Sequence, residues 1–263
     1  MREFFGIGGY ERAPEGYLSW QHLLFVTLLL AVMTAAAVIL GRRNRGRDMK
    51  TAVLPLAVTG ILIDVLELSM IVFRCFREGN PWQWLYSLPL FLCSIPLFAI
   101  PMAAFTRGRL QEASLDFVAI FGILAAVMGT YGAGNNYGSY PVLGIDNVHS
   151  GITHAIAGFA SLYILIAGLA SMKRKNIWIS FSIITVFCGL AYIADVLIPY
   201  NYMFLMRGDG TPYDIVFDLT GGNPVIYPLT VLLMFFAYIA VFYLIFYLTA
   251  GKCRAKAAEK SAD

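Results

Sequence analysis

The chain alternates between long blocks of hydrophobic residues and short polar segments. Seven blocks are candidates for membrane spans, because a helix needs about 20 residues to cross the hydrocarbon core. The blocks cover residues 20–40, 52–76, 84–101, 113–130, 150–171, 177–198 and 225–249. The pattern predicts an all-α, polytopic membrane protein with seven transmembrane helices in residues 20–250. An extracytoplasmic segment at 1–19 precedes them, and a cytoplasmic basic tail at 251–263 follows.

The third block differs from the others because it contains Pro89, Pro96 and Pro101. A proline removes a backbone donor and crowds the preceding turn of a helix. In lipid, the freed carbonyl groups need partners inside the protein. We therefore expect residues 84–101 to form a kinked helix at the centre of the bundle, with Cys93 between two kinks.

Composition agrees with a membrane-embedded chain. Hydrophobic residues make up 59% of the sequence and charged residues 13%, whereas an ordinary soluble domain contains about 25% charged residues. The formal net charge of +3 is too small to favour binding of nucleic acid. Membrane lipids are the expected partners.

The distribution of basic residues predicts the orientation. Most of the 19 lysines and arginines follow the first, third, fifth and seventh blocks. Basic residues concentrate in cytoplasmic loops of membrane proteins. The N-terminus is therefore predicted outside and the C-terminus in the cytoplasm, as a multi-pass protein of the cell membrane.

Polar side chains within the predicted spans gather toward the outer side. Ionisable groups in a span are costly and usually face the bundle interior with a partner. At a rise of about 1.5 Å per residue, one of them lies near the midplane and the others in the outer half. These residues are Asp64 near the midplane, and His22, Glu67, Cys93, His149, His154 and Asp195 in the outer half. The asymmetry predicts an outward-facing polar pocket.

Each of these residues also has a structural interpretation. Asp64 and Glu67 share one helix face and would serve packing if each paired with an arginine or a tyrosine. Asp195 would cap the following loop together with Asn201 or Tyr202. Cys93 would be a small packing residue.

The histidines do not form a recognisable metal motif. His149 and His154 are five residues apart, about 140° around a helix, so they do not share a face as paired zinc ligands do. A zinc site that combines both with His22 stays open, but its spacing does not support it. We expect no metal and no cofactor. His149 is expected at the membrane interface, and His154, one turn farther in, is better placed for chemistry.

Three stretches carry a resemblance to a known family. They are LPLFLC at residues 88–93, NVHSGITH at 147–154, and NYMFL at 201–205 with the acidic segment that follows. Together they resemble the YwaF-like integral membrane proteins of bacteria. Those are similar to a eukaryotic multispanning protein described as a cysteine-dependent phospholipid acyltransferase, and distantly to androgen-regulated membrane hydrolases of fatty acid esters. This chain has Phe91 where the bacterial pattern usually has histidine.

The resemblance implies acyl transfer or ester hydrolysis on a lipid. Cys93 would be the nucleophile, His154 the base, and Asp195 or Glu67 the group that orients the histidine. Residues expected around the substrate are His22, Asp64, Glu67, His149, Asn201 and Tyr202. Two alternatives stay open, namely a carrier for a small solute or ion that uses Asp64 and Glu67, and a sensor or scaffold without chemistry.

Overall fold

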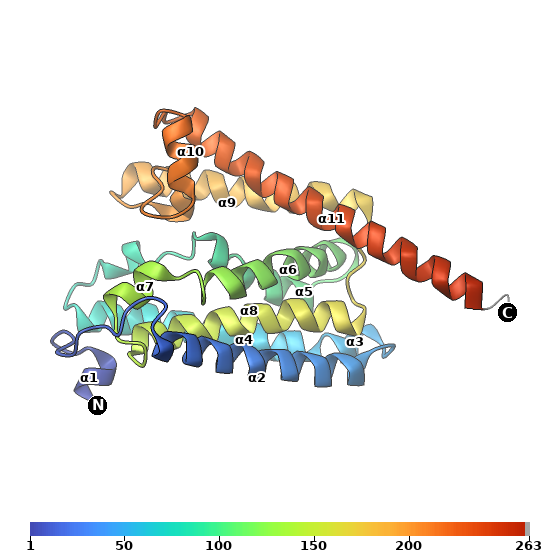
Figure 1. Cartoon of the computed structure of the whole chain (residues 1–263), viewed down its shortest axis with the longest axis horizontal. Helices are drawn as coiled ribbons and strands as arrows, with labels where there is room; N and C mark the ends of the chain where they lie inside the picture. Colours follow the sequence, from blue (N-terminus) through green and yellow to red (C-terminus); the bar gives the residue numbers. More distant parts are fainter. Residues whose placement is uncertain (261–263) are drawn as a thin grey trace. The chain divides into compact units, whose positions relative to one another are not determined.

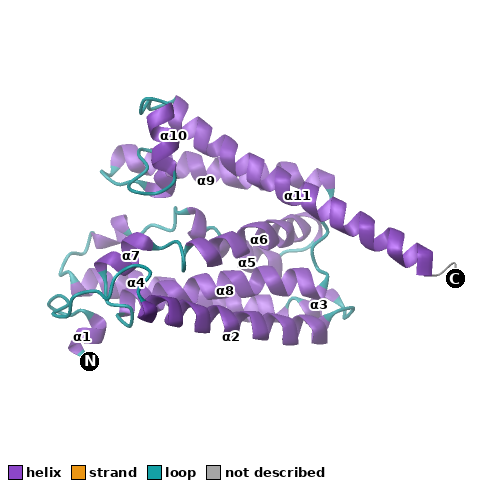
Figure 2. Ribbon diagram, viewed as in Figure 1, coloured by secondary structure: helices purple, strands orange, loops and turns teal. Residues whose placement is uncertain are grey.

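The computed structural model describes the backbone of residues 1–260 and the side chains of residues 1–249. Every regular element in this part of the chain is a helix, as Figure 2 shows. The chain divides into two compact units, Met1–Ser171 and Met172–Asp263.

Six helices of the described residues are long and apolar enough to cross a membrane. They are Trp20–Asn44, Met49–Arg77, Gly108–Met128, Ile145–Ala167, Arg174–Leu197 and Ile226–Thr249. They match six of the seven blocks predicted from the sequence. The protein is therefore a multi-pass, all-α membrane protein.

The proline-rich block is different from the expectation, because it is not one continuous helix. Short 3₁₀ turns, η1 (Gln83–Tyr86) and η2 (Leu92–Ser94), precede the ten-residue helix α5 (Pro96–Phe105). Ten residues extend for about 15 Å, half of the hydrocarbon thickness. Pro96 stands at the helix start, where the first N–H groups have no partner within the helix, so its missing N–H costs nothing. Backbone groups before Pro96 are partly satisfied by hydrogen bonds within turns, such as that from Ser94 N to the carbonyl oxygen of Phe91 at 2.9 Å.

The first unit is built around α8 (Ile145–Ala167) rather than around the proline-rich block. Helix α8 contacts α2 (Trp20–Asn44), α4 (Leu54–Arg77), α5 and α6 (Gly108–Met128). Figure 1 shows α2, α4 and α8 running side by side in this unit. Helix α5 packs against α4, α6 and α8, so it is one member of the bundle and not its axis.

Glycines allow these helices to approach each other closely. A Cβ added at Gly122 of α6 would lie 2.4 Å from the carbonyl oxygen of Ala157 in α8, and one at Gly158 would lie 2.4 Å from Met33 Sδ in α2. Ser161 of α8 donates a hydrogen bond of 2.6 Å to the carbonyl oxygen of Ala119. Small residues and interhelical hydrogen bonds of this kind drive helix association in lipid. The hydrophobic effect does not drive it there, because the lipid tails are as apolar as the helix side chains.

Short elements complete the first unit. Two one-turn helices, α1 (Arg2–Phe5) and α3 (Met49–Ala52), lie near the N-terminus and between α2 and α4. Helix α7 (Gly134–Ser139) lies in the loop between α6 and α8. Residues before α2 are tied to this loop, because Tyr17 Oη donates to the carbonyl oxygen of Tyr131 at 2.8 Å and Glu15 accepts from Val142 N at 2.8 Å.

The second unit contains two long helices, α9 (Ile177–Leu197) and α11 (Ile226–Lys260). The 3₁₀ turns η3 (Arg174–Asn176) and η4 (Tyr202–Phe204) flank α9, and α10 (Tyr213–Leu219) lies in the loop before α11. Phe181 stacks on Phe236 between the long helices, with ring centroids 4.4 Å apart. The predicted basic tail at 251–263 belongs to α11 as far as Lys260, and residues 261–263 lie outside the described residues.

Candidate functional site

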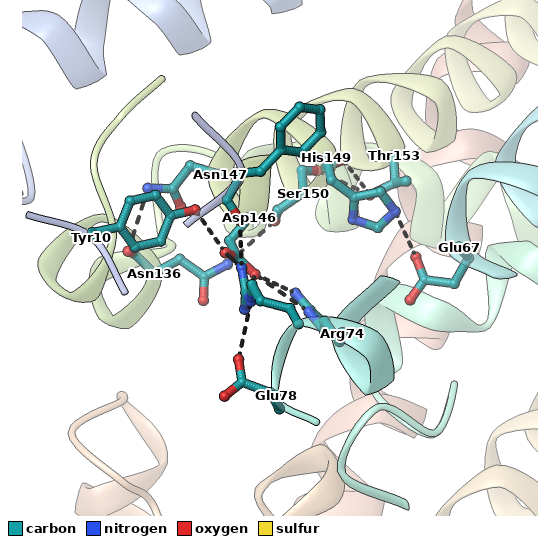
Figure 3. A network of polar contacts seen from close by, with 12 residues as sticks. Tyr10, Glu67, Arg74, Glu78, Asn136, Asp146, Asn147, His149, Ser150 and Thr153 are labelled. Atoms are coloured by element: carbon teal, nitrogen blue, oxygen red, sulfur yellow. Dashed lines mark hydrogen bonds and ion pairs between the residues drawn. The ribbon is translucent and has the colours of Figure 1, made fainter. Parts of the chain in front are cut away.

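A polar network lies at one end of the first unit, where α4 and α6 end and α2 and α8 begin (Figure 3). Its centre is Asp146, in the first turn of α8, with only 2% of its side chain exposed. The carboxylate accepts hydrogen bonds from two arginines at the end of α4. Arg77 Nη1 lies 2.6 Å from Oδ2, and Arg74 Nη2 lies 3.2 Å from Oδ1.

The N-terminal segment joins the same network. Tyr10 Oη donates to Asp146 Oδ2 at 2.9 Å. Burial and the neighbouring Asp146 carboxylate raise the pKa of Tyr10 to about 12, so its hydroxyl keeps its proton at physiological pH. Arg77 also donates to Glu78 at 3.0 Å and to the carbonyl oxygen of Phe5 at 3.5 Å. Asp146 therefore holds the segment before α2 against the end of α4 and the start of α8.

A histidine and a carboxylate meet beside this network. His149 Nε2 of α8 lies 3.3 Å from Glu67 Oε2 of α4, as Figure 3 shows. Both side chains are mostly buried, with 9% of His149 and 22% of Glu67 exposed. The Glu67 carboxylate also acts electrostatically on the thiol of the half-buried Cys93. The structure thus places an imidazole of α8 next to a carboxylate of α4, and the charge of this carboxylate reaches the thiol of the η2 turn.

Helix α8 gives the other predicted histidine a different environment. His154 Nδ1 donates to the carbonyl oxygen of Ser150 at 2.7 Å, one turn earlier in the same helix. Its ring lies against the backbone of Gly129, where an added Cβ would be 1.7 Å from Cδ2. A neutral His154 therefore keeps a lone pair on Nε2, and the ion pair of Glu67 is with His149 and not with His154.

His22 is fully buried and has partners on both ring nitrogens. Nδ1 accepts from Leu18 N at 3.1 Å, and Nε2 donates to the carbonyl oxygen of Thr130 at 3.2 Å. The ring also packs against Tyr137, with centroids 3.9 Å apart and the ring planes tilted by 32°. Among the described residues, no group of three or more metal-binding side chains is close enough to hold an ion.

The remaining predicted site residues lie elsewhere. Asp64 is half-buried on α4, one turn before Glu67. Asp195, Asn201 and Tyr202 belong to the second unit. Asp195 Oδ1 accepts from Tyr202 N at 2.7 Å, and Asn201 Nδ2 donates to the carbonyl oxygen of Arg207 at 2.8 Å. These contacts fit the loop-capping alternative for Asp195.

A family model described as the TMEM164 family matches residues 17–247. The protein belongs to the TMEM164 family. The matched range includes the apolar part of each of the six helices that could cross the membrane. It also includes Cys93, Glu67 and His149. Searches of curated proteins and of solved structures each found no match.

The sequence pattern did not predict that Asp146, Arg74, Arg77 and Tyr10 belong to one site. One signal was present, because Arg74 and Arg77 are three residues apart and so share a face at the end of α4. Their common partner is 72 positions from Arg74 in the sequence. Only the packing of α4 on α8 identifies Asp146 as that partner.

Proposed function

We propose that this TMEM164-family protein acts on the acyl chains of membrane lipids, by acyl transfer or ester hydrolysis. The observation that carries the proposal is the contact of 3.3 Å between Glu67 and His149, together with the electrostatic influence of Glu67 on the Cys93 thiol. Nucleophilic acyl chemistry needs a nucleophile, a base within reach, and a group that orients the base. In our proposal Cys93 is the nucleophile, His149 the base and Glu67 the orienting group, so that His149 takes the role expected for His154.

In the proposed reaction, Cys93 Sγ attacks the carbonyl carbon of a lipid ester while His149 accepts the thiol proton. Glu67 stabilises the imidazolium that forms. His149 returns the proton to the departing lysolipid oxygen, and a thioester remains on Cys93. An alcohol group of a second lipid completes a transfer, and water completes a hydrolysis. Either attack releases the acyl group and restores the thiol.

The resemblance to YwaF-like proteins and to a cysteine-dependent acyltransferase supports this reaction class. The usual histidine of the bacterial pattern is replaced by Phe91, which precedes Cys93 by two residues. In our proposal, α8 supplies the histidine instead. Asp195 is proposed to act locally, as the cap of the loop after α9, and not as a catalytic group.

We further propose that the protein lies in the cell membrane with its N-terminus outside. In the first unit, the end of α2 and the start of α6 carry the basic cluster, including Arg42, Arg43 and Arg109. The Glu67–His149 pair lies toward the opposite end. The chain from η1 to α5 connects the end of α4 with the start of α6, and these lie at opposite ends of the unit (Figure 1). We propose that it is the seventh crossing, with irregular backbone shielded by neighbouring helices.

Labelling of the full-length protein in native membranes tests the reaction. The probe is a long-chain electrophile with an alkyne tag, applied to the parent protein and to Cys93→Ser, Glu67→Gln, His149→Asn and His154→Asn. We expect Cys93→Ser to abolish labelling and His149→Asn to lower its rate by about 100-fold, since a general base typically contributes 10²–10⁴. Cys75→Ser is the matched control, because Cys75 is also a half-buried free cysteine of the first unit.

Undiminished labelling in His149→Asn would contradict the assignment of His149. If His154→Asn lowered labelling instead, the Glu67–His149 pair would be structural and His154 the base. Lipid turnover that persists in Cys93→Ser would overturn thiol chemistry altogether.

A further inference from the structure

A groove runs along the exposed side of α2, away from the candidate site. Its volume is about 660 Å³, and it is lined by Thr27, Leu30, Ala31, Thr34, Ala35, Val38, Ile39 and Tyr131. Ala31, Thr34 and Ala35 are exposed and small, so the helix surface is hollow between larger neighbours. The lining is almost entirely apolar, which suits hydrocarbon and not water.

The two ends of the groove differ. At one end, Tyr131 Oη lies 2.7 Å from Thr27 Oγ1 and closes the groove. From Thr27 to Ile39 the helix rises about 18 Å, close to one leaflet of hydrocarbon at about 15 Å. At the other end α2 continues to Arg42 and Arg43 in its last turn, and both side chains are exposed. Arg42 follows Val38 by four residues, so it continues the face of the groove.

We propose that this groove binds one acyl chain of an anionic phospholipid, with the lipid phosphate at Arg42 and Arg43. The groove has the length of an acyl layer, is bounded at one end by the Thr27–Tyr131 contact, and points at its other end toward two cations. Guanidinium groups bind phosphate oxygens through paired, charge-assisted hydrogen bonds. The proposal is independent of the acyl chemistry, because the groove shares no residue with the Cys93 site.

A second copy of the chain fits the groove less well. Two copies that packed through this face about a two-fold axis along the membrane normal would bring the same positions together. Arg42 and Arg43 of one copy would then face those of the other, and like charges repel. A lipid phosphate instead neutralises them, so charge complementarity favours the lipid.

Native mass spectrometry of the full-length protein tests the proposal. The protein is reconstituted with equimolar phosphatidylglycerol and phosphatidylcholine, extracted in detergent, and the retained lipids are counted. We expect preferential retention of phosphatidylglycerol in the parent protein. Arg42→Gln should lower that preference about fivefold, the equivalent of about 1 kcal/mol for one basic residue at a membrane surface.

Two pairs of variants make the result specific. Ala35→Trp fills the groove and should abolish retention, whereas Val32→Trp, at a position 69% exposed on α2 but outside the groove, should not. Arg47→Gln alters an exposed arginine beyond the helix and should leave the preference unchanged. Equal retention of both lipids, or an equal effect of Arg47→Gln and Arg42→Gln, would overturn the proposal. A dimer mass that disappears in Ala35→Trp would assign the groove to a second copy and overturn it as well.

Discussion

His22 lies in the first turn of α2 and has a backbone partner on each ring nitrogen, Leu18 N before α2 and the carbonyl oxygen of Thr130 after α6. The N–H of Leu18 can only donate and the carbonyl of Thr130 can only accept, so the contacts select the tautomer with hydrogen on Nε2. A histidine held in this way serves packing better than proton transfer. The sequence placed His22 near the substrate, and its contacts favour a structural role.

Replacement of His22 by phenylalanine tests this role. His22→Phe keeps a ring against Tyr137 but removes the partner of Leu18 N and one of the two donors to Thr130 O. Leaving a buried polar group unsatisfied costs about 1–3 kcal/mol. We expect a lower thermal unfolding midpoint in detergent. Tyr17→Phe, which removes an exposed hydrogen bond to Tyr131, should change the midpoint much less. An unchanged midpoint in His22→Phe would show that the two contacts do not stabilise the fold.

Asp146 is the most connected acidic residue described above, and its removal should be costly. Asp146→Asn leaves the buried Arg77 and the half-buried Arg74 without their shared counter-charge. Breaking a buried ion pair from one side costs about 3–5 kcal/mol. We expect a large loss of thermal stability and faster proteolysis of the segment before α2, which Tyr10 no longer anchors through a carboxylate.

Asp48→Asn is the control for that measurement. Asp48 is exposed and caps α3 through Thr51 N at 3.0 Å, so its loss should affect stability only slightly. Equal effects of the two variants would contradict the central position of Asp146.

At the scale of elements, close contact at glycine explains why α8 occupies the middle of the first unit. The backbone of α6 approaches α8 at Gly122, and α8 approaches α2 at Gly158. A larger residue at either position would separate helices that hold Ser161 against the carbonyl oxygen of Ala119.

The glycine contact predicts the result of a minimal substitution. Gly122→Ala places a methyl group 2.4 Å from the carbonyl oxygen of Ala157 and should destabilise the protein by about 1–3 kcal/mol, a typical cost of overpacking. Gly189→Ala in α9 meets nothing within 4 Å. It should stabilise its helix slightly, because alanine has a higher helix propensity than glycine. Thermal unfolding of both variants compares them directly, and the same sign of shift in both would refute the packing argument.

The proline-rich stretch, residues 84–101, differs from the other apolar blocks in its conformation. Its apolar content resembles that of the neighbouring spans, but its helix begins only at Pro96. Three prolines remove donors from 13 consecutive residues, so turns replace a continuous helix before that point. Hydrophobicity therefore did not predict the conformation of this segment, and its crossing of the membrane stays a prediction.

At the scale of the whole molecule, the number of crossings decides the topology. Six crossings would put both termini on one side of the membrane, and seven put them on opposite sides. We expect a fluorescent protein fused after residue 263 to fluoresce in the cytoplasm and alkaline phosphatase fused in the loop at 199–224 to be active outside. An epitope at residue 1 should be accessible on intact cells. Termini found on the same side would mean that residues 83–105 do not cross.

The sequence by itself determined the class of the protein, six of the seven helices predicted from it, and the ends at which charges gather. These properties depend on local composition, because any run of about 20 apolar residues satisfies the length of a membrane span. The tertiary structure decided which side chains meet. Glu67 is paired with His149 and not with His154, and Asp146 unites two arginines with Tyr10, because helix rotation and packing bring together residues that are far apart in the chain. No pattern of spacing within one segment specifies such rotations.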